Sequence, residues 1–264
     1  MSRTRWWLIG VIALATVASG VLVGLLVVKR IESGQWQMIS SADLVEVKAR
    51  LTGPVPPRPS RVIYLAREPL TFTPGVDDAA RGQSSVVAAK AGKPIKVPGW
   101  KGTAKGWGQV VTCVEKLFAP FDVVVTDQRP TGDDFVLVAV GGRPGDVGET
   151  NKRVGGLAPF SGGVIPRAVV FVFSTQLGNQ VTPVCETIGM EVAHAYGLDH
   201  GYLCKDVMTY LKPCGAKSFV DQDVPCGETK KRPCMGGAPT QNSYRRLLEI
   251  LGPARPVPVA GPGR

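Results

Sequence analysis

Two histidines, the only ones among 264 residues, lie six positions apart at His194 and His200. At about 100° per residue, His194 shares one face of a helix with Met190 and Glu191. The opposite, apolar face carries Ile188, Val192 and Ala195. Imidazole and carboxylate groups bind metal ions and transfer protons. The spacing therefore indicates a metal or acid–base site, and its alternative is a pair of structural histidines.

The elements around this stretch must bring the two histidines together. Thr182 can cap the helix and Pro183 suits its first position, where the missing N–H costs nothing. Gly197 is a plausible stop, because glycine readily takes the left-handed backbone of a helix end. A turn at this glycine predicts that His200 comes back toward the helix face that carries His194.

The stretch resembles the zinc helix of the metzincin metallopeptidases, whose pattern is H-E-x-x-H-x-x-G-x-x-H. The resemblance makes Glu191 the general base, His194 and His200 the second and third zinc ligands, and Gly197 the turn glycine. The position of the first ligand holds Met190.

A second match to that family contains Met208, eight residues after His200. The sequence Asp206-Val207-Met208-Thr209-Tyr210 resembles the methionine-bearing turn of metzincins. The resemblance implies that Met208 lies beneath the metal and that Tyr210 steadies the oxyanion of the reaction.

Met190 limits the function that can be expected. Zinc favours imidazole, carboxylate and thiolate, whereas a thioether is soft and better suited to copper(I). We therefore expect a weakened zinc site and a peptide-binding pseudopeptidase with weak or lost hydrolysis. The alternative is an active zinc endopeptidase that uses His194, His200 and an unconventional third ligand. Candidates for that ligand, none at the family spacing, are Glu186, Asp199, Cys204 and Asp206.

The N-terminal 30 residues contain an uncharged run at positions 6–28, flanked by Arg3, Arg5, Lys29 and Arg30. At about 1.5 Å per residue this run can cross a bilayer core of about 30 Å. It predicts a transmembrane signal-anchor, with a cleaved signal peptide near Ala18-Ser19-Gly20 and a secreted product as the alternative. Residues 31–60 are a proline-rich stem, and residues 253–264 a proline-rich tail.

Residues 61–252 have the length and pattern of one α+β domain. Apolar runs predict strands at 61–66, 122–126, 135–140 and 168–173, and helical spacing predicts helices at 109–118, from 182, and at 241–251. This order of elements is the one the metzincin resemblance implies: a mixed twisted sheet, two long helices, the active-site helix and a C-terminal helix. Residues 69–106, rich in Gly, Pro and Lys, are expected to be irregular.

The resemblance also suggests how a ligand is held. The glycine-rich segment 154–164 occupies the place of the metzincin edge strand, which would pair with an extended peptide. Main-chain pairing of this kind holds peptides of varied sequence. The expected partners are thus a peptide or protein along this edge and a membrane at the N-terminus.

Six cysteines lie in the predicted domain. An even number after an export or anchor segment predicts disulfides, and therefore a domain outside the cytoplasm, periplasmic or extracellular. Proximity in sequence favours Cys204 with Cys214 and Cys226 with Cys234, which leaves Cys113 with Cys185. The rival interpretation, a structural zinc on the last four cysteines, has no C-x-x-C pair to support it.

The net charge of +10 leaves an acidic partner open. Anionic lipid or an envelope polymer would fit, and so would a merely solvated basic surface. Nucleic acid is not expected for an exported chain without a dense basic block interleaved with aromatic residues.

Overall fold

The computed structural model describes residues 9–12, 26–30, 36–38 and 57–255. Its contacts divide the chain into two units, Met1–Pro56 and Pro57–Arg264. In the first unit, β1 (Ile9–Ile12), β2 (Leu26–Arg30) and β3 (Trp36–Met38) form an antiparallel sheet in the order β1-β2-β3.

The predicted membrane anchor at residues 6–28 falls mainly outside the described residues. Its described parts, residues 9–12 and 26–28, are strands. Within the described part of the chain, no helix combines the length and the apolar character needed to cross a bilayer. The anchor therefore stays a prediction.

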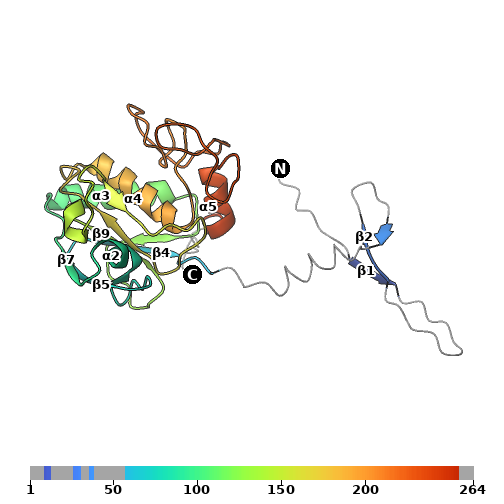
Figure 1. Ribbon diagram of the computed structural model, residues 1–264, viewed down its shortest axis with the longest axis horizontal. Helices are drawn as coiled ribbons and strands as arrows, with labels where there is room; N and C mark the ends of the chain where they lie inside the picture. Colours follow the sequence, from blue (N-terminus) through green and yellow to red (C-terminus); the bar gives the residue numbers. More distant parts are fainter. Residues whose placement is uncertain (1–8, 13–25, 31–35, 39–56, 256–264) are drawn as a thin grey trace, which may run out of the picture. The chain divides into compact units, whose positions relative to one another are not determined.

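A five-stranded mixed sheet forms the centre of the second unit (Figure 1). Its order is β10-β11-β9-β4-β8, in which β11, β9, β4 and β8 run parallel and β10 is an antiparallel edge strand. The bounds are β4 Val62–Ala66, β8 Val124–Thr126, β9 Val136–Val140, β10 Gly156–Leu157 and β11 Val169–Val172. The four predicted strands and the edge strand within 154–164 are confirmed, as is the α+β class.

Helices cover one face of this sheet. In Figure 1, α3 (Ala104–Phe118) and α4 (Val181–Ala195) lie side by side above the strands, and α5 (Ser243–Leu251) stands at their end. Alternate strand residues point into this layer, because successive side chains of a strand face opposite sides. They join the apolar sides of α3, α4 and α5 in one core, and include Ile63, Leu65, Val136, Val138, Val170 and Val172.

The other face of the sheet is covered by a segment that was expected to be irregular. That prediction for residues 69–106 is wrong: the segment forms β5 (Leu70–Pro74), β6 (Gln83–Ser84), α2 (Ser85–Lys90) and β7 (Ile95–Val97), with sheet order β6-β5-β7. It buries Phe72, Val87 and Val97 against Leu137 and Phe171 of the main sheet. Its elements are too short to show a period, so only the tertiary contacts reveal them.

Two helix starts also differ from the sequence prediction. Helix α3 begins at Ala104, five residues early, because Thr103 caps it by accepting a hydrogen bond from the Gly106 N–H. Helix α4 begins at Val181 with Gln180 as its N-cap, so Thr182 does not cap it. Pro183 lies within the first turn, where the N–H it lacks would have no partner in the helix.

Three disulfides join the pairs that the sequence favoured: Cys113–Cys185, Cys204–Cys214 and Cys226–Cys234. The first ties α3 to α4, and the other two close short loops in the segment between α4 and α5. The structural zinc on cysteine is thereby excluded for these residues. Three disulfides are typical of a domain outside the cytoplasm.

Candidate metal centre

Helix α4 supplies Met190, Glu191 and His194 from one face, and the structure buries that face. Their exposed fractions are 8%, 5% and 7%, while Ile188 and Val192 on the apolar face are fully buried. Helix α4 has the apolar face and the polar face that the sequence predicts, but the polar face is buried as well. The centroid of the Phe160 ring lies 5.3 Å from that of the His194 ring, with the two planes tilted by 52°, and the phenyl ring helps to cover the imidazole.

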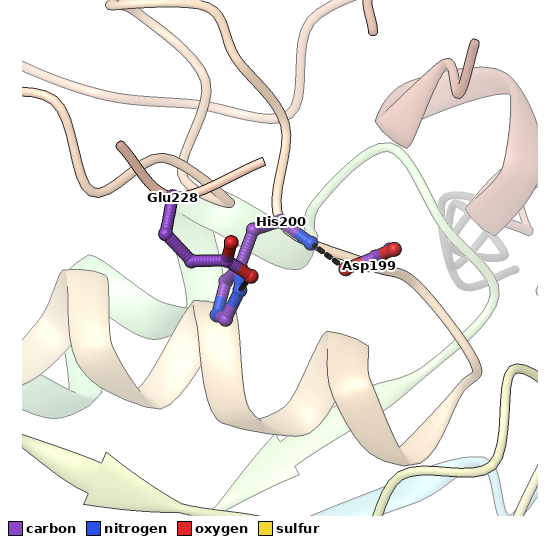
Figure 2. A group of neighbouring side chains, drawn as sticks. All are labelled: Asp199, His200 and Glu228. Carbon is purple, nitrogen blue, oxygen red and sulfur yellow. Dashed lines mark hydrogen bonds and ion pairs between the residues drawn. The ribbon is translucent and has the colours of Figure 1, made fainter. Parts of the chain in front are cut away.

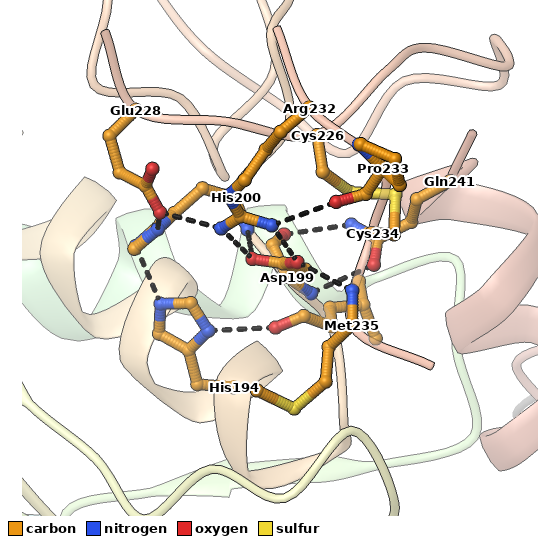
Figure 3. A network of polar contacts seen from close by, with 11 residues as sticks. His194, Asp199, His200, Cys226, Glu228, Arg232, Pro233, Cys234, Met235 and Gln241 are labelled. Atoms are coloured by element: carbon orange, nitrogen blue, oxygen red, sulfur yellow. Dashed lines mark hydrogen bonds and ion pairs between the residues drawn. A yellow bond between two sulfur atoms is a disulfide. The ribbon is translucent and has the colours of Figure 1, made fainter. Parts of the chain in front are cut away.

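The turn after α4 returns the chain to this face. Gly197 has φ +88°, a left-handed conformation that favours glycine, and its N–H donates to the His194 carbonyl. A side chain at Gly197 would also meet the backbone of Gly163 at 2.9 Å. The turn brings the Nε2 atoms of His194 and His200 to 3.0 Å (Figure 3), so the predicted convergence of the two histidines is confirmed.

The partners of the two Nδ1 atoms fix where the ring protons are. His194 Nδ1 lies 2.7 Å from the carbonyl oxygen of Leu198, which can only accept. His200 Nδ1 lies 2.8 Å from a carboxylate oxygen of Glu228. Both Nδ1 atoms must therefore donate, and in neutral rings both Nε2 atoms carry lone pairs. Two lone pairs facing each other at 3.0 Å need a proton or a metal ion between them.

At neutral pH that proton does not belong to His194; either Nε2 of His200 carries it and donates to His194, or a metal ion takes its place. Burial, and then the charge of nearby His200, lower the pKa of His194 to about 4. The ring is therefore neutral at pH 7 and has an Nε2 lone pair to offer. This is the protonation state in which imidazole binds metal ions.

Glu228 is a site residue that sequence reasoning missed. It accepts from His200 Nδ1 and from Arg232 Nη2, at 2.8 and 2.7 Å (Figure 3). The Arg232 hydrogen bond lowers the pKa of Glu228 to about 2, so the group is ionised. Carboxylates that accept from a metal-binding histidine orient its ring and raise its basicity. The one sequence signal was its place in the short loop closed by Cys226 and Cys234.

Asp199 lies within 4.8 Å of His200 and Glu228, counted between possible ligand atoms (Figure 2). Its two oxygens already accept from both Arg232 Nη atoms and from the N–H groups of His200 and Met235, at 2.6 to 2.9 Å. Burial alone would raise the pKa of Asp199, but these hydrogen bonds lower it to about 2. We interpret Asp199 as a residue that holds the turn after α4 against the loop at residues 232–235, and not as a metal ligand.

The remaining third-ligand candidates are engaged elsewhere. Glu186 forms an ion pair with Lys217 at 3.3 Å, and Cys204 is in a disulfide. Asp206 accepts from the Met208 N–H at 2.8 Å and from the Ser243 hydroxyl at 2.5 Å, which ties the methionine turn to α5. All four third-ligand candidates from the sequence are thus engaged in other interactions.

The methionine turn lies next to His200. Met208 is fully buried and its carbonyl accepts from the Gly201 N–H at 3.1 Å. The Tyr210 ring lies 4.4 Å from the His200 ring, and the side chain is 48% exposed. Burial, with the charges of Glu191 and Glu228, raises the pKa of Tyr210 to about 12, so its hydroxyl stays a hydrogen-bond donor at neutral pH.

The side chain of Glu191 extends from α4 to the edge strand β10. A side chain at Gly156 would meet its Cγ at 2.6 Å, so glycine is needed for the carboxyl to fit beside the strand. Burial raises the pKa of Glu191 from 4.5 to about 8. A carboxyl group with a pKa near neutrality can exchange protons with a reacting group.

One pocket of the described residues borders this centre and another lies away from it. One of about 330 Å³ borders it and is lined by Gly162, Gly197, Met235 and Gln241 among others. Another of about 780 Å³ lies away from the histidines, between α3, the segment at 217–219 and α5, and three of its lining residues are Lys105, Lys116 and Lys217.

No protein-family model matches the chain, and no curated protein is similar to it. The residues and their geometry therefore carry the functional argument.

Proposed function

We propose that the chain is a metzincin-like protein that acts outside the cytoplasm and binds peptides beside a weakened two-histidine metal site, with little or no hydrolysis. The observation that carries this proposal is the 3.0 Å approach of the Nε2 atoms of His194 and His200 when both Nδ1 atoms are donors. Such an arrangement suits a shared metal ion.

The surroundings support a peptide as the ligand. The edge strand β10 pairs with β11 on one side only within the main sheet, and it runs beside Glu191 on α4. A free strand edge can pair with an extended peptide. The exposed Tyr210 and Met235 side chains lie near the histidines and offer apolar contacts to such a ligand.

Weak hydrolysis follows from the ligand set. A catalytic zinc site has three protein ligands and an open position for water. Here the position one turn before His194 holds Met190, and the carboxylates predicted as substitutes are in other interactions. The site supplies two of the three protein ligands that a catalytic zinc ion needs, and this ligand set does not support a hydrolytic step.

An active zinc endopeptidase is the second candidate, and one observation favours it. Glu191 and Tyr210 are near the histidine pair with raised pKa values, as the base and oxyanion donor of the family would be. If a third ligand came from the substrate or from a rearranged loop, zinc would polarise the scissile carbonyl.

The two candidates can be separated by exposing the full-length chain to a mixed peptide library with and without zinc. We expect peptides to be retained by the chain and recovered intact. Zinc-dependent cleavage that Glu191→Ala abolishes would establish the endopeptidase instead. The absence of both retention and cleavage would contradict the proposed function.

A further inference from the structure

The mismatch between Met190 and zinc raises the question of which ion the site would prefer. The two converged donors are imidazoles, and Met190 is the buried residue one helical turn before His194 on the same face of α4. Residues four apart on a helix are neighbours, and a pair at this spacing can bind one metal ion. The Glu191 carboxyl on this face lies against Gly156 of β10. The other donor groups of the helix and its turn are two imidazoles and one thioether.

This donor set is chemically selective. A thioether is a soft ligand that zinc uses poorly and copper(I) uses well, and imidazole serves both metals. All three groups bind metal ions in their uncharged forms; Met190 and His194 are buried, Phe160 lies against His194, and Tyr210 lies beside His200. The cost of burying an ion grows with the square of its charge, so a +2 ion costs about four times as much as a +1 ion before ligands compensate.

We propose that the metal ion selected by this site is copper(I), held by Nε2 of His194, Nε2 of His200 and the sulfur of Met190. Glu228 contributes by accepting from His200 Nδ1, which fixes the ring and supplies one negative charge behind it. The inference rests on the proposed two-histidine centre, but not on peptide binding. It assigns the centre a different metal from the one the metzincin resemblance implies.

The test is a competition for copper(I) between the full-length chain and a colorimetric copper(I) chelator. Ascorbate keeps the copper reduced, and thiols are left out because they would open the three disulfides. We expect one copper(I) per chain, bound at least about 100-fold more tightly than zinc measured in a matching zinc competition. Zinc remaining in the protein is removed beforehand with a chelator.

Variants then assign the ligands. Met190→Leu keeps the side-chain volume and removes the sulfur, so it should weaken copper(I) binding about tenfold or more and change zinc binding less than about twofold. Met235→Leu tests a competing sulfur, because Met235 lies near the centre with its N–H on Asp199, and we expect it to change the affinity for neither metal. His200→Ala should lose both metals.

Three results would overturn the inference. Zinc bound as tightly as copper(I) would mean that the site is not selective, although the two-histidine centre of the proposed function would stand. Loss of copper(I) binding in Met235→Leu but not in Met190→Leu would show that Met235, and not Met190, supplies the sulfur ligand. Copper(I) retained in His200→Ala would place the ion elsewhere and would also count against the proposed centre.

Discussion

Ionisation of Glu191 opposes folding, because the carboxyl group is buried in the folded protein. Its folded-state pKa of about 8 exceeds the ordinary 4.5, so the folded protein keeps a proton that the unfolded chain releases as pH rises. The stabilising proton is fully present below pH 4.5, and stability falls between pH 4.5 and about 8, by about 1.4 kcal/mol per pH unit at most.

Glu191→Gln removes this titration while keeping the shape of the side chain. In metal-free buffer we expect the variant to match the wild type near pH 4 and to be more stable by a few kcal/mol at pH 8. Urea unfolding at a series of pH values measures the difference. If wild type and variant keep the same stability difference from pH 4 to pH 8, the Glu191 carboxyl is not buried as described.

Residue types and spacing were enough to predict that the turn at Gly197 returns His200 toward His194, because all three depend on one helix and the turn that follows it. Glu228 could not be predicted in this way. It is 28 residues from His200 in sequence, and tertiary contacts bring its loop back to the site, among them the Arg232–Asp199 ion pair and the hydrogen bond from the Gly227 N–H to the His200 carbonyl.

At the scale of elements, the contact between α4 and β10 depends on one glycine. A Cβ at Gly156 would lie 2.6 Å from Glu191 Cγ and 2.8 Å from the carbonyl oxygen of Phe171, which is backbone in the paired strand β11. Neither neighbour can move without disturbing the sheet edge or the buried carboxyl group.

Gly156→Ala should therefore destabilise the protein by about 1 to 3 kcal/mol through overpacking. Gly108→Ala is the matched control: it lies inside α3 with nothing within 4 Å of the new methyl group. That control should instead stabilise by up to about 1 kcal/mol, because alanine favours the helix. Denaturant unfolding measures both, and equal effects of the two substitutions would refute the close approach.

Element prediction succeeded for β4, β9 and β11, where uninterrupted apolar runs are buried on both faces. It failed for the layer at residues 69–106. Strand β6 has two residues and β7 three, so neither shows a period, and Val97 of β7 is buried in one cluster with Phe171 and Leu137 of the main sheet.

At the scale of the whole molecule, one disulfide contributes mainly to stability and another mainly to the geometry of the site. Cys113–Cys185 closes a loop of 72 residues and joins α3 to α4, whereas Cys226–Cys234 spans eight residues and holds the loop of Glu228 and Arg232. Restriction of the unfolded chain grows with loop length, so the first is worth about 4 kcal/mol and the second about 2.5 kcal/mol.

Replacing each pair by alanine should separate these roles. We expect loss of Cys113–Cys185 to lower the free energy of unfolding more and to leave metal affinity nearly unchanged once the protein is folded. Loss of Cys226–Cys234 should weaken metal binding about tenfold, because Glu228 no longer fixes His200. Unfolding and metal titrations of both variants check this, and a reversed order of effects would contradict it.

The central claim is that Met190 occupies the position of a missing zinc ligand beside two converged histidines. Calorimetric zinc titration of the full-length wild type and of Met190→His tests it most directly. The account predicts weak zinc binding by the wild type and an affinity at least about 100-fold higher in the variant, since a third imidazole joins His194 and His200. Tight zinc binding by the wild type that Met190→His leaves unchanged, or no zinc binding by either protein, would contradict it.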